Sequence, residues 1–376
     1  MTAEVLVVGA GVAGLALAGH LQDRGISVQV VERAARLRTA RAGIVLHPNA
    51  LASLGRLRED LVARGAALSR QVAIDPDGRR SEVRWDLVWG ELGLPLAVHR
   101  RVLSDLLFAA IAPGTVRFGT APTSVAEEDD GVQVGFDDGS TGRYRLVAGA
   151  DGIGSWVRGR LAPGIVPAYS GHTFVRTTVA MTEPERLRDW HVWRTSRSFL
   201  GAMPVGGDRA AVFLQLTAPE PLRLTPEQAR REVLDAVPRL PAEVGRLFET
   251  FVLDDEVVAR PAATVTAPRM TGGRLALLGD AARALSPATS QGGGMAVEDA
   301  AVLADEVARH GCGSAALSAY ERRRRPRVDS FLRSAHRHLV LMSAVQHDPD
   351  LTRRQSHHQD ASSWFRRLYM PLTPIP

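Results

Sequence analysis

The sequence contains no lysine, so all 46 of its basic residues are arginine. Without a lysine amine the protein can form no Schiff base, use no lysine general base and hold no lysine haloamine. The single cysteine, Cys312, excludes a disulfide framework and a metal cluster built from cysteines. Apolar runs are also short, and none approaches the ~18 residues of a membrane-spanning helix. We therefore expect no membrane span.

The positive charge of the chain is modest, with a net charge of +5 and 23% charged residues. The densest basic run, Arg322–Arg327, lies in an expected helix from Ser318 to about Val345 and has few aromatic residues near it. Proteins that bind nucleic acids usually combine such a run with stacking aromatics. We therefore interpret the run as a solvent-facing side of the helix and expect no nucleic-acid partner. The first residues lack the basic region of a secretory signal, so a cytoplasmic location is expected.

The first part of the chain has the pattern of a strand, a glycine-rich turn, a helix and a second strand. An apolar run over 3–8 predicts a buried parallel strand, which leads into the turn GAGVAG at 9–14. A helix follows to about Gly25, and a second apolar strand over 26–31 ends at Glu32. This is the dinucleotide-binding fingerprint in its expected structural context.

Each glycine of the turn has a physical reason in this pattern. Gly9 permits the tight turn, Gly11 lets the backbone approach a pyrophosphate, and Gly14 lets the helix pack closely on the strand. Glu32 can accept hydrogen bonds from a ribose diol, and its charge disfavours a 2′-phosphate. The turn by itself does not choose between NAD, NADP and FAD.

Two later segments repeat the plan of an apolar strand, a glycine–aspartate pair and the start of a helix. They are LVAGADGIGSWVR at 146–158 and RLALLGDAARALSPATSQGGGMAVEDA at 274–300. Together with GAGVAG, they make the chain resemble the group A flavin-dependent monooxygenases of the para-hydroxybenzoate hydroxylase type. Smaller matches at 41–51, at 99–103 and in the segment YERRRRPRV support the resemblance, which covers residues 3 to about 340.

The resemblance implies an α/β fold. In it, a Rossmann-like FAD-binding domain of the GR2 type carries an inserted mixed β-sheet substrate domain and a C-terminal helix. The implied FAD-binding domain is discontinuous and comprises 1–70, 95–165 and 269–345. The substrate-binding domain comprises 71–94 and 166–268, and residues 346–376 form a C-terminal tail.

Local patterns predict the elements of the inserted domain. Alternating apolar residues over 172–181 and 210–216 predict strands, and a turn within 72–84 predicts a hairpin that joins the same sheet. A helix is predicted over 226–237. In the tail, the apolar residues within 362–369 predict a short amphipathic helix that packs on the body of the protein or on a dimer partner.

The resemblance also implies which residues hold FAD. Asp280 would accept hydrogen bonds from the ribityl hydroxyls, and Glu32 would bind the adenosine ribose. A helix that starts at Gly292 would turn its free N–H groups toward the flavin edge that becomes negative on reduction. The implied cofactor-binding residues are Gly9, Gly11, Gly14, Glu32, Arg33, Arg41, Arg100, Asp151, Gly152, Asp280, Gly292, Gly293 and Gly294. The alternative for Asp280 is a helix N-cap.

The chain departs from the family pattern at two places near the implied flavin. Many members have histidine where this chain has Arg283. Many have asparagine where this chain has Gly294 and Met295. Both differences lie near the implied flavin, so the resemblance leaves the substrate geometry and the mobility of the flavin open, while FAD binding itself is still expected.

A substrate would lie between the inserted sheet and the flavin, because pockets favour domain junctions. His47 and Pro287 are the implied catalytic residues, since both belong to segments that pass beside the flavin ring in the family. The candidate pocket residues are Trp193, Phe199, Met203, Phe213 and Gln215. The apolar candidates fit an ordinary hydrophobic core equally well. No metal site is predicted, because the adjacent His357 and His358 point in different directions.

The implied activity is that of a single-component FAD-dependent monooxygenase. NADH or NADPH would bind transiently and reduce FAD. Oxygen would then form a flavin C4a-hydroperoxide that hydroxylates or epoxidises an electron-rich aromatic or polyketide-like molecule. A same-fold flavin reductase or isomerase, and a catalytically silent FAD-binding protein, remain alternatives, whereas a flavin halogenase would need a lysine. The expected assembly is a monomer or a homodimer.

Overall fold

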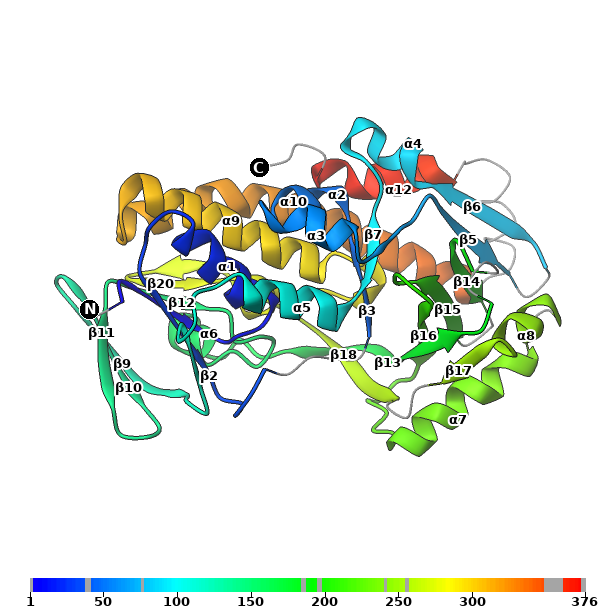
Figure 1. The fold of residues 1–376 in the computed structure, drawn as a ribbon, viewed down its shortest axis with the longest axis horizontal. Coiled ribbons are helices and arrows are strands. Elements are labelled where there is room, and N and C mark those ends of the chain that lie inside the picture. Colours follow the sequence, from blue (N-terminus) through cyan, green and yellow to red (C-terminus); the bar gives the residue numbers. More distant parts are fainter. Residues whose placement is uncertain are drawn as a thin grey trace.

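The computed structural model describes residues 3–37, 42–75, 78–183, 187–194, 198–239, 242–253, 257–347 and 361–372. One large sheet lies on the left of Figure 1 and another on the right, and long helices run across the top. Strands and helices alternate through the first sheet, and the second sheet is inserted between its segments. The predicted α/β fold class is thereby confirmed.

The first sheet is mostly parallel and is built from short runs of branched apolar residues. Its order is β19 (Thr271–Gly272), β20 (Leu275–Leu277), β12 (Leu146–Gly149), β1 (Val5–Val8), β2 (Val28–Glu32) and β8 (Val116–Phe118). All four residues of β1 are buried, as in a strand covered on both faces. Val5 pairs with Leu146 of β12 and with Val28 of β2. The carboxyl ends of these strands therefore meet at one edge, where ligands bind in such sheets.

The second sheet is mixed and forms the opposite side of the molecule. Its order is β21 (Arg283–Ala284), β18 (Val258–Thr266), β13 (Ala168–Met181), β16 (Arg209–Thr217), β15 (Ser198–Pro204), β14 (Trp190–Arg194), β5 (Arg70–Ile74) and β6 (Arg80–Arg84), and β17 (Phe251–Leu253) pairs with β13. The neighbours are antiparallel except β14 and β5, which are parallel. The predicted hairpin over 72–84 does join this sheet.

Two smaller sheets complete the strand content of the described residues. One has the order β3 (Gly43–Leu46), β7 (Leu96–His99) and β4 (Ala66–Ala67), and the other has the order β11 (Thr141–Tyr144), β10 (Gly131–Phe136) and β9 (Pro122–Glu128). The helices besides those of the second sheet are α1 (Val12–Gln22), α2 (Pro48–Ala52), α3 (Leu57–Val62), α4 (Trp85–Trp89), α5 (Arg100–Ala109), α6 (Trp156–Leu161), α9 (Gly292–His310), α10 (Ser314–His347) and α12 (Ala361–Tyr369).

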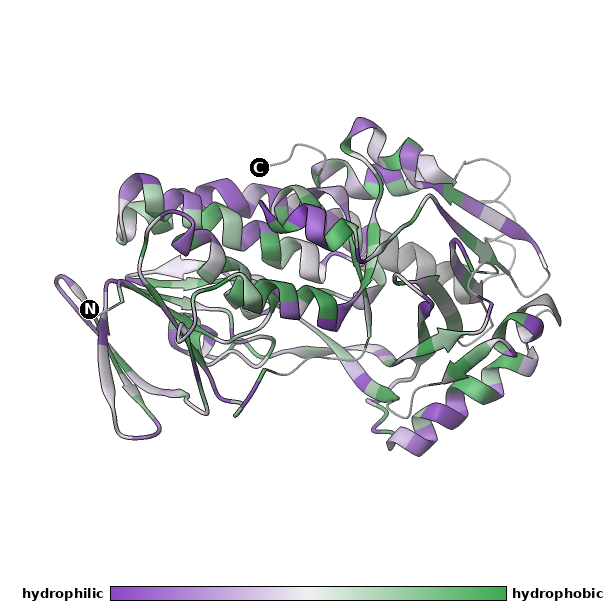
Figure 2. Ribbon diagram, viewed as in Figure 1, coloured by the Kyte–Doolittle hydropathy of each residue, from purple (hydrophilic) through white to green (hydrophobic). Residues whose placement is uncertain are grey.

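The second sheet buries one face under α7 (Pro226–Ala236) and α8 (Ala242–Phe248). Along α7, hydrophobic and hydrophilic residues alternate in Figure 2. The hydrophobic ones include Ala229 and Val233, which are buried in the same cluster as Val175 of β13. The predicted helix over 226–237 is therefore present, and the other face of the sheet is left to face the first sheet.

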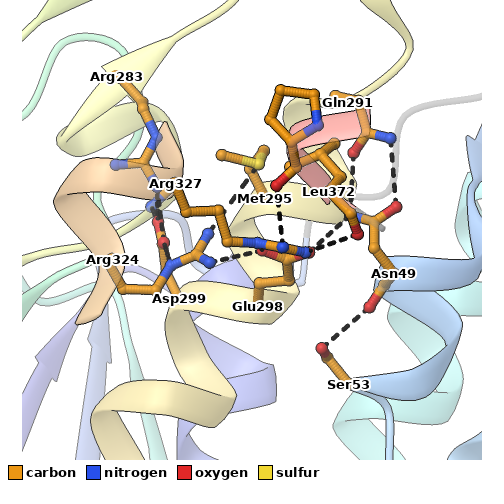
Figure 3. Close-up of polar contacts among 12 residues, drawn as sticks. Asn49, Ser53, Arg283, Gln291, Met295, Glu298, Asp299, Arg324, Arg327 and Leu372 are labelled. Carbon is orange, nitrogen blue, oxygen red and sulfur yellow. Dashed lines mark hydrogen bonds and ion pairs between the residues drawn. The ribbon is translucent and has the colours of Figure 1, made fainter. Parts of the chain in front are cut away.

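A buried ion cluster joins α9 to α10, and Figure 3 shows its residues. It consists of Arg283, Glu298, Asp299, Arg324 and Arg327. Arg324 donates to both Glu298 and Asp299, and Arg327 lies 2.7 Å from Glu298. Burial by itself raises the pKa of Glu298, but Arg324 and Arg327 outweigh it and bring that pKa to about 2. The cluster therefore remains charged at neutral pH and binds the two helices together.

The ion cluster corrects the interpretation of the run Arg322–Arg327 as a solvent-facing surface. Arg324 is completely buried, and 11% of the Arg327 side chain is exposed. The prediction was wrong for Arg324, because helical periodicity turns one residue of any such run toward the neighbouring helix. Glu298 and Asp299 of α9 lie beside Arg324 at this contact. A buried arginine is stable only beside such partners.

The C-terminal tail is described only in part. The predicted amphipathic helix is α12, which packs against α4, β6 and α10. The Tyr369 hydroxyl donates to the Thr289 carbonyl over 3.0 Å, and Arg327 donates to the carbonyls of Pro371 and Leu372. These contacts attach α12 and the residues after it to the body of the protein. Packing on the body was one of the two predicted arrangements of this helix. The division of the chain into two discontinuous domains stays a prediction.

Candidate functional site

A cavity of about 830 Å³ lies between the two large sheets. We call it the central cavity. One side is formed by the start of α1, the loop after β20 and the start of α9. The other side is formed by β13, β15, β16 and the β5–β6 hairpin, with α12 closing one end. The lining is continuous, so two ligands can meet inside it.

The glycines of the first turn divide into two roles. A Cβ atom at Gly14 would lie 1.9 Å from the Gly9 carbonyl oxygen, and a Cβ at Gly9 would lie 2.6 Å from the Ala150 oxygen. Gly9 also has a φ of 104°, which favours glycine. A Cβ at Gly11, in contrast, would meet nothing within 4 Å. Gly9 and Gly14 therefore allow the turn to pack, and Gly11 leaves open space in the cavity at the start of α1.

Glu32 lies at the end of β2 beside this turn. Its carboxylate accepts hydrogen bonds from the backbone N–H groups of Ala10 and Ala34, each over 2.9 Å. A carboxylate oxygen can accept more than one hydrogen bond, so both oxygens can still receive a diol. Arg33 is exposed and does not line the cavity. Arg41 lies outside the described residues.

Asp280 presents its carboxylate to the cavity in the short 3₁₀ helix Gly279–Ala281 that follows β20. Within the described residues the carboxylate makes no hydrogen bond, and it caps no helix. Burial raises the pKa of Asp280, and the charges of Arg100 and Arg283 oppose the rise. The N-cap alternative is therefore wrong, and Asp280 remains an unused acceptor on the wall of the cavity.

The three glycines at the start of α9 differ in whether they line the cavity. Gly292 has open space beside it, since the nearest atom to a Cβ there would be an Asp280 oxygen at 4.0 Å. Gly292 and Gly293 line the cavity, as does Pro287 in the 3₁₀ helix Pro287–Thr289. Gly294 does not line it. A Cβ there would lie 2.8 Å from the Gln291 side chain, so this glycine allows close packing.

The two departures from the family pattern lie away from the cavity wall. Arg283 is buried in the ion cluster, where it donates to both carboxylate oxygens of Asp299. Asp299 in turn accepts from the Gly279 N–H over 2.9 Å, next to Asp280. Met295 is 1% exposed and belongs to a hydrophobic cluster. Both side chains therefore point into the protein interior, and neither lines the cavity.

The aspartate of the second motif supports a helix. Asp151 accepts from Ser155 and from the N–H groups of Trp156 and Val157 at the start of α6. Its neighbour Gly152, with a φ of 78°, lines the cavity. The motif therefore offers its backbone rather than its carboxylate to a ligand.

A family model described as the FAD binding domain matches residues 2–335. The chain belongs to this FAD-binding family. It is 31% identical over 343 residues to an aurachin C monooxygenase/isomerase of Stigmatella aurantiaca, a match that covers 89% of this chain and 88% of the relative. It is 32% identical to a 3-amino-4-hydroxybenzoate 2-monooxygenase of Streptomyces cremeus, with 89% of this chain and 86% of that one covered.

A solved structure supports the same assignment. HpxO of Klebsiella pneumoniae, in complex with FAD and uric acid, superposes with a TM-score of 0.88 at 25% identity, over 99% of this chain and 97% of that one. The predicted family is therefore confirmed, the cofactor is FAD, and the protein is a flavin-dependent monooxygenase. The cavity fits this cofactor, because Gly11 and Gly292 leave space for it and Asp280 has an acceptor to offer.

The free face of the second sheet forms the side of the cavity opposite the FAD-binding turns. Phe199, Met203, Phe213 and Gln215 line the cavity there. Trp193 does not, because it lies on the opposite face, where its ring contacts Phe248 at a centroid distance of 5.9 Å. Its predicted place in the substrate pocket was therefore wrong, since neighbouring residues of a strand face opposite sides.

His47 also lies outside the lining of the cavity. It is completely buried between Trp85, Trp89 and Tyr369, and the Trp89 indole N–H donates to its Nδ1 over 3.2 Å. Burial lowers the pKa of His47 to about 3, so the imidazole stays neutral at physiological pH. The expectation that His47 touches the reacting groups is corrected, because its ring packs into an aromatic cluster beneath α12.

The structure adds cavity residues that the sequence patterns did not single out. His172, Phe174 and Arg176 occupy alternate positions of β13, and all three line the cavity. The signal was their spacing of two residues along a predicted strand, which places them on one face. The helix α12 contributes Trp364, Phe365 and Tyr369. Within the described ranges, no helix is both long and apolar enough to span a bilayer.

Proposed function

We propose that the protein uses NAD(P)H and O₂ to hydroxylate or epoxidise an electron-rich aromatic or polyketide-like small molecule. The observation that carries the proposal is the single continuous cavity. Its lining joins the FAD-binding turns to the free face of the second sheet. A substrate on that face can approach the flavin without crossing a wall. The names of the aurachin and aminohydroxybenzoate relatives support an aromatic substrate.

The residues of the first side are proposed to hold the cofactor. Bound FAD supplies the oxygen chemistry, once NADH or NADPH has reduced it and O₂ has reacted with it. Asp280 would bind the ribityl hydroxyls and Glu32 the adenosine ribose. Gly11 and the first N–H groups of α1 would face the pyrophosphate. We propose Arg33, Arg41 and Arg100 as the basic residues along the cofactor.

The start of α9 is proposed to face the flavin ring. The first N–H groups of a helix lack partners within it and lie at the positive end of its dipole. Gly292 and Gly293 let the ring approach these groups, which stabilise negative charge on it. Gly294 would support the turn from behind, and Gly152 would offer its backbone to the cofactor. Pro287 would lie beside the ring, next to the substrate.

The apolar lining is proposed to exclude water around the reacting atoms. Phe174, Phe199 and Phe213 form edge-to-face contacts with centroids 6.0–6.5 Å apart. Such a lining favours a flat aromatic ligand and protects a reactive oxygen species from water. The proposal includes a cytoplasmic location, where NAD(P)H is available, and a monomer or homodimer.

Oxygen transfer under labelled O₂ tests the proposal. The purified yellow holoprotein is mixed with NADPH or NADH and a panel of phenols, quinolones and polyketide-like aromatics. We expect at least one compound to accelerate NAD(P)H oxidation and to gain one labelled oxygen atom, seen by mass spectrometry. NAD(P)H oxidation that yields only hydrogen peroxide with every compound would contradict the proposal and favour a flavin reductase.

A further inference from the structure

Arg176 is a cation inside the central cavity for which the described residues provide no carboxylate. It lies in the middle of β13, mostly buried, with its guanidinium 5.3 Å from the centre of the Phe174 ring. The guanidinium makes a cation–π contact with this ring, and no hydrogen bond or ion pair joins it to the described residues. Arg176 differs in this respect from the arginines of the ion cluster.

Neither acidic residue on the described wall of the cavity, Asp75 or Asp280, forms an ion pair with Arg176. Asp75 forms an ion pair with Arg194, with 2.9 Å between Oδ1 and Nη1. Asp280 interacts electrostatically with Arg100 and Arg283. Burial, and then repulsion from Arg100, lower the pKa of Arg176 to about 10, so it is still protonated at neutral pH. A desolvated cation without a counter-ion is costly, and a ligand with a negative charge would remove that cost.

A second unsatisfied polar group lies on the same face of the sheet. Gln215 is 4% exposed, and its Oε1 has no hydrogen-bond partner among the described residues. Its Nε2 lies 3.2 Å from Nδ1 of His172. On β16, Gln215 is opposite Phe174 of β13, two residues from Arg176 along the strand. The wall thus presents a cation, an acceptor and aromatic rings within a few residues of one another.

We propose that Arg176 binds a carboxylate of the substrate, so that the enzyme acts on aromatic acids. A guanidinium can donate two parallel hydrogen bonds to a carboxylate, which fixes both the position and the plane of the ligand. Gln215 Oε1 would accept from a hydroxyl or amino group of the same molecule. The aromatic ring would lie against Phe199 and Phe213. This inference rests on the proposed function, since it names the class of its substrate.

A pair of neutral and acidic probes tests the role of Arg176. The FAD-loaded protein is titrated at neutral pH with 4-hydroxybenzoate and with 4-hydroxybenzamide, and binding is followed by the change in flavin absorbance. We expect the acid to bind about tenfold more tightly or better, the value of one charge-assisted contact. In Arg176→Gln the acid should lose this advantage, while the amide binds as before. Arg176→Lys should keep part of it, because the charge remains without the planar fork.

A matched control removes the same charge outside the cavity. Arg101 is exposed on α5 and pairs with Asp105, so Arg101→Gln should preserve the preference for the acid. Equal binding of the two probes, binding of neither, or a preference that survives Arg176→Gln would overturn the proposal. Loss of FAD from Arg176→Gln would also overturn it, because Arg176 would then belong to the cofactor site.

The outcome is separable from that of the proposed function. Oxygen transfer to neutral aromatics with no preference for acids would overturn the carboxylate site and leave the monooxygenase intact. A preference for the acid that depends on Arg176, in a protein that transfers no oxygen to any compound, would support the carboxylate site and contradict the proposed reaction.

Discussion

The two sides of the central cavity are built in different ways. The FAD side consists of turns, each formed by residues close together in the sequence, and it offers backbone groups beside glycines. The other side, which we propose to bind the substrate, consists of single side chains. They lie two residues apart on strands within 70–84 and 168–217, and on the helix α12. A site made of backbone depends on local conformation. A site made of side chains depends on which face of a sheet each residue occupies.

The largest expected effect concerns packing on the FAD side. Gly14→Ala should lower the free energy of unfolding by about 3 kcal/mol or more, because its Cβ would overlap the Gly9 carbonyl. Gly11→Ala is the matched control, since its Cβ meets no protein atom. It should unfold like the parent in urea but bind FAD more weakly. Equal stability of the two variants would contradict the separation of roles.

The second effect is a loss of stability in acid, and it tests whether His47 is buried away from both sides of the cavity. Its pKa is about 3 in the folded protein against 6.5 in the unfolded chain, so only the unfolded state gains a proton between these values. Stability is therefore complete above pH 6.5 and should fall by about 3 kcal/mol on acidification to about pH 4. His47→Phe should show a smaller fall in urea unfolding over this range. An unchanged slope would mean that His47 is hydrated, as a cavity residue would be.

The third largest effect should follow removal of the Asp280 carboxylate on the FAD side. Asp280→Ala should weaken FAD binding by on the order of 2 kcal/mol, because the ribityl hydroxyls lose a charged acceptor. Fluorescence titration of the apoprotein measures the change. Asp280→Asn keeps an acceptor without the charge, so its affinity for FAD should lie between those of the parent and Asp280→Ala. A fully yellow Asp280→Ala protein with parental affinity would remove Asp280 from the FAD site.

The smallest effect concerns the substrate side. Phe199→Leu should weaken binding of an oxygenated aromatic substrate by about 1 kcal/mol, the value of an aromatic contact. Trp193→Phe is the control, since Trp193 faces α8 on the other side of the sheet. It should leave substrate binding as it was. A larger loss with Trp193→Phe than with Phe199→Leu would reverse our assignment of the two faces.

Several residues show where inference from the sequence reaches its limit. Phe199 and Trp193 look equally suitable for a pocket, and strand parity assigns them to opposite faces. Arg324 looks like its neighbours in a basic run, yet the rotation of α10 brings it to Glu298 and Asp299. His47 is close in sequence to cavity residues, but its ring turns toward the aromatic residues of α4 and α12. In each case the deciding partner is far away along the chain.

The sequence by itself determined the family, the α/β fold and the FAD-binding turns. Glycine is required wherever a backbone must turn with positive φ or approach another atom closely, and such requirements are local. Only the tertiary structure decided which side chains line the cavity, and it singled out Arg176 as a cation with no counter-ion among the described residues. That choice depends on the faces and neighbours of distant strands and helices, which come together only when the chain is folded.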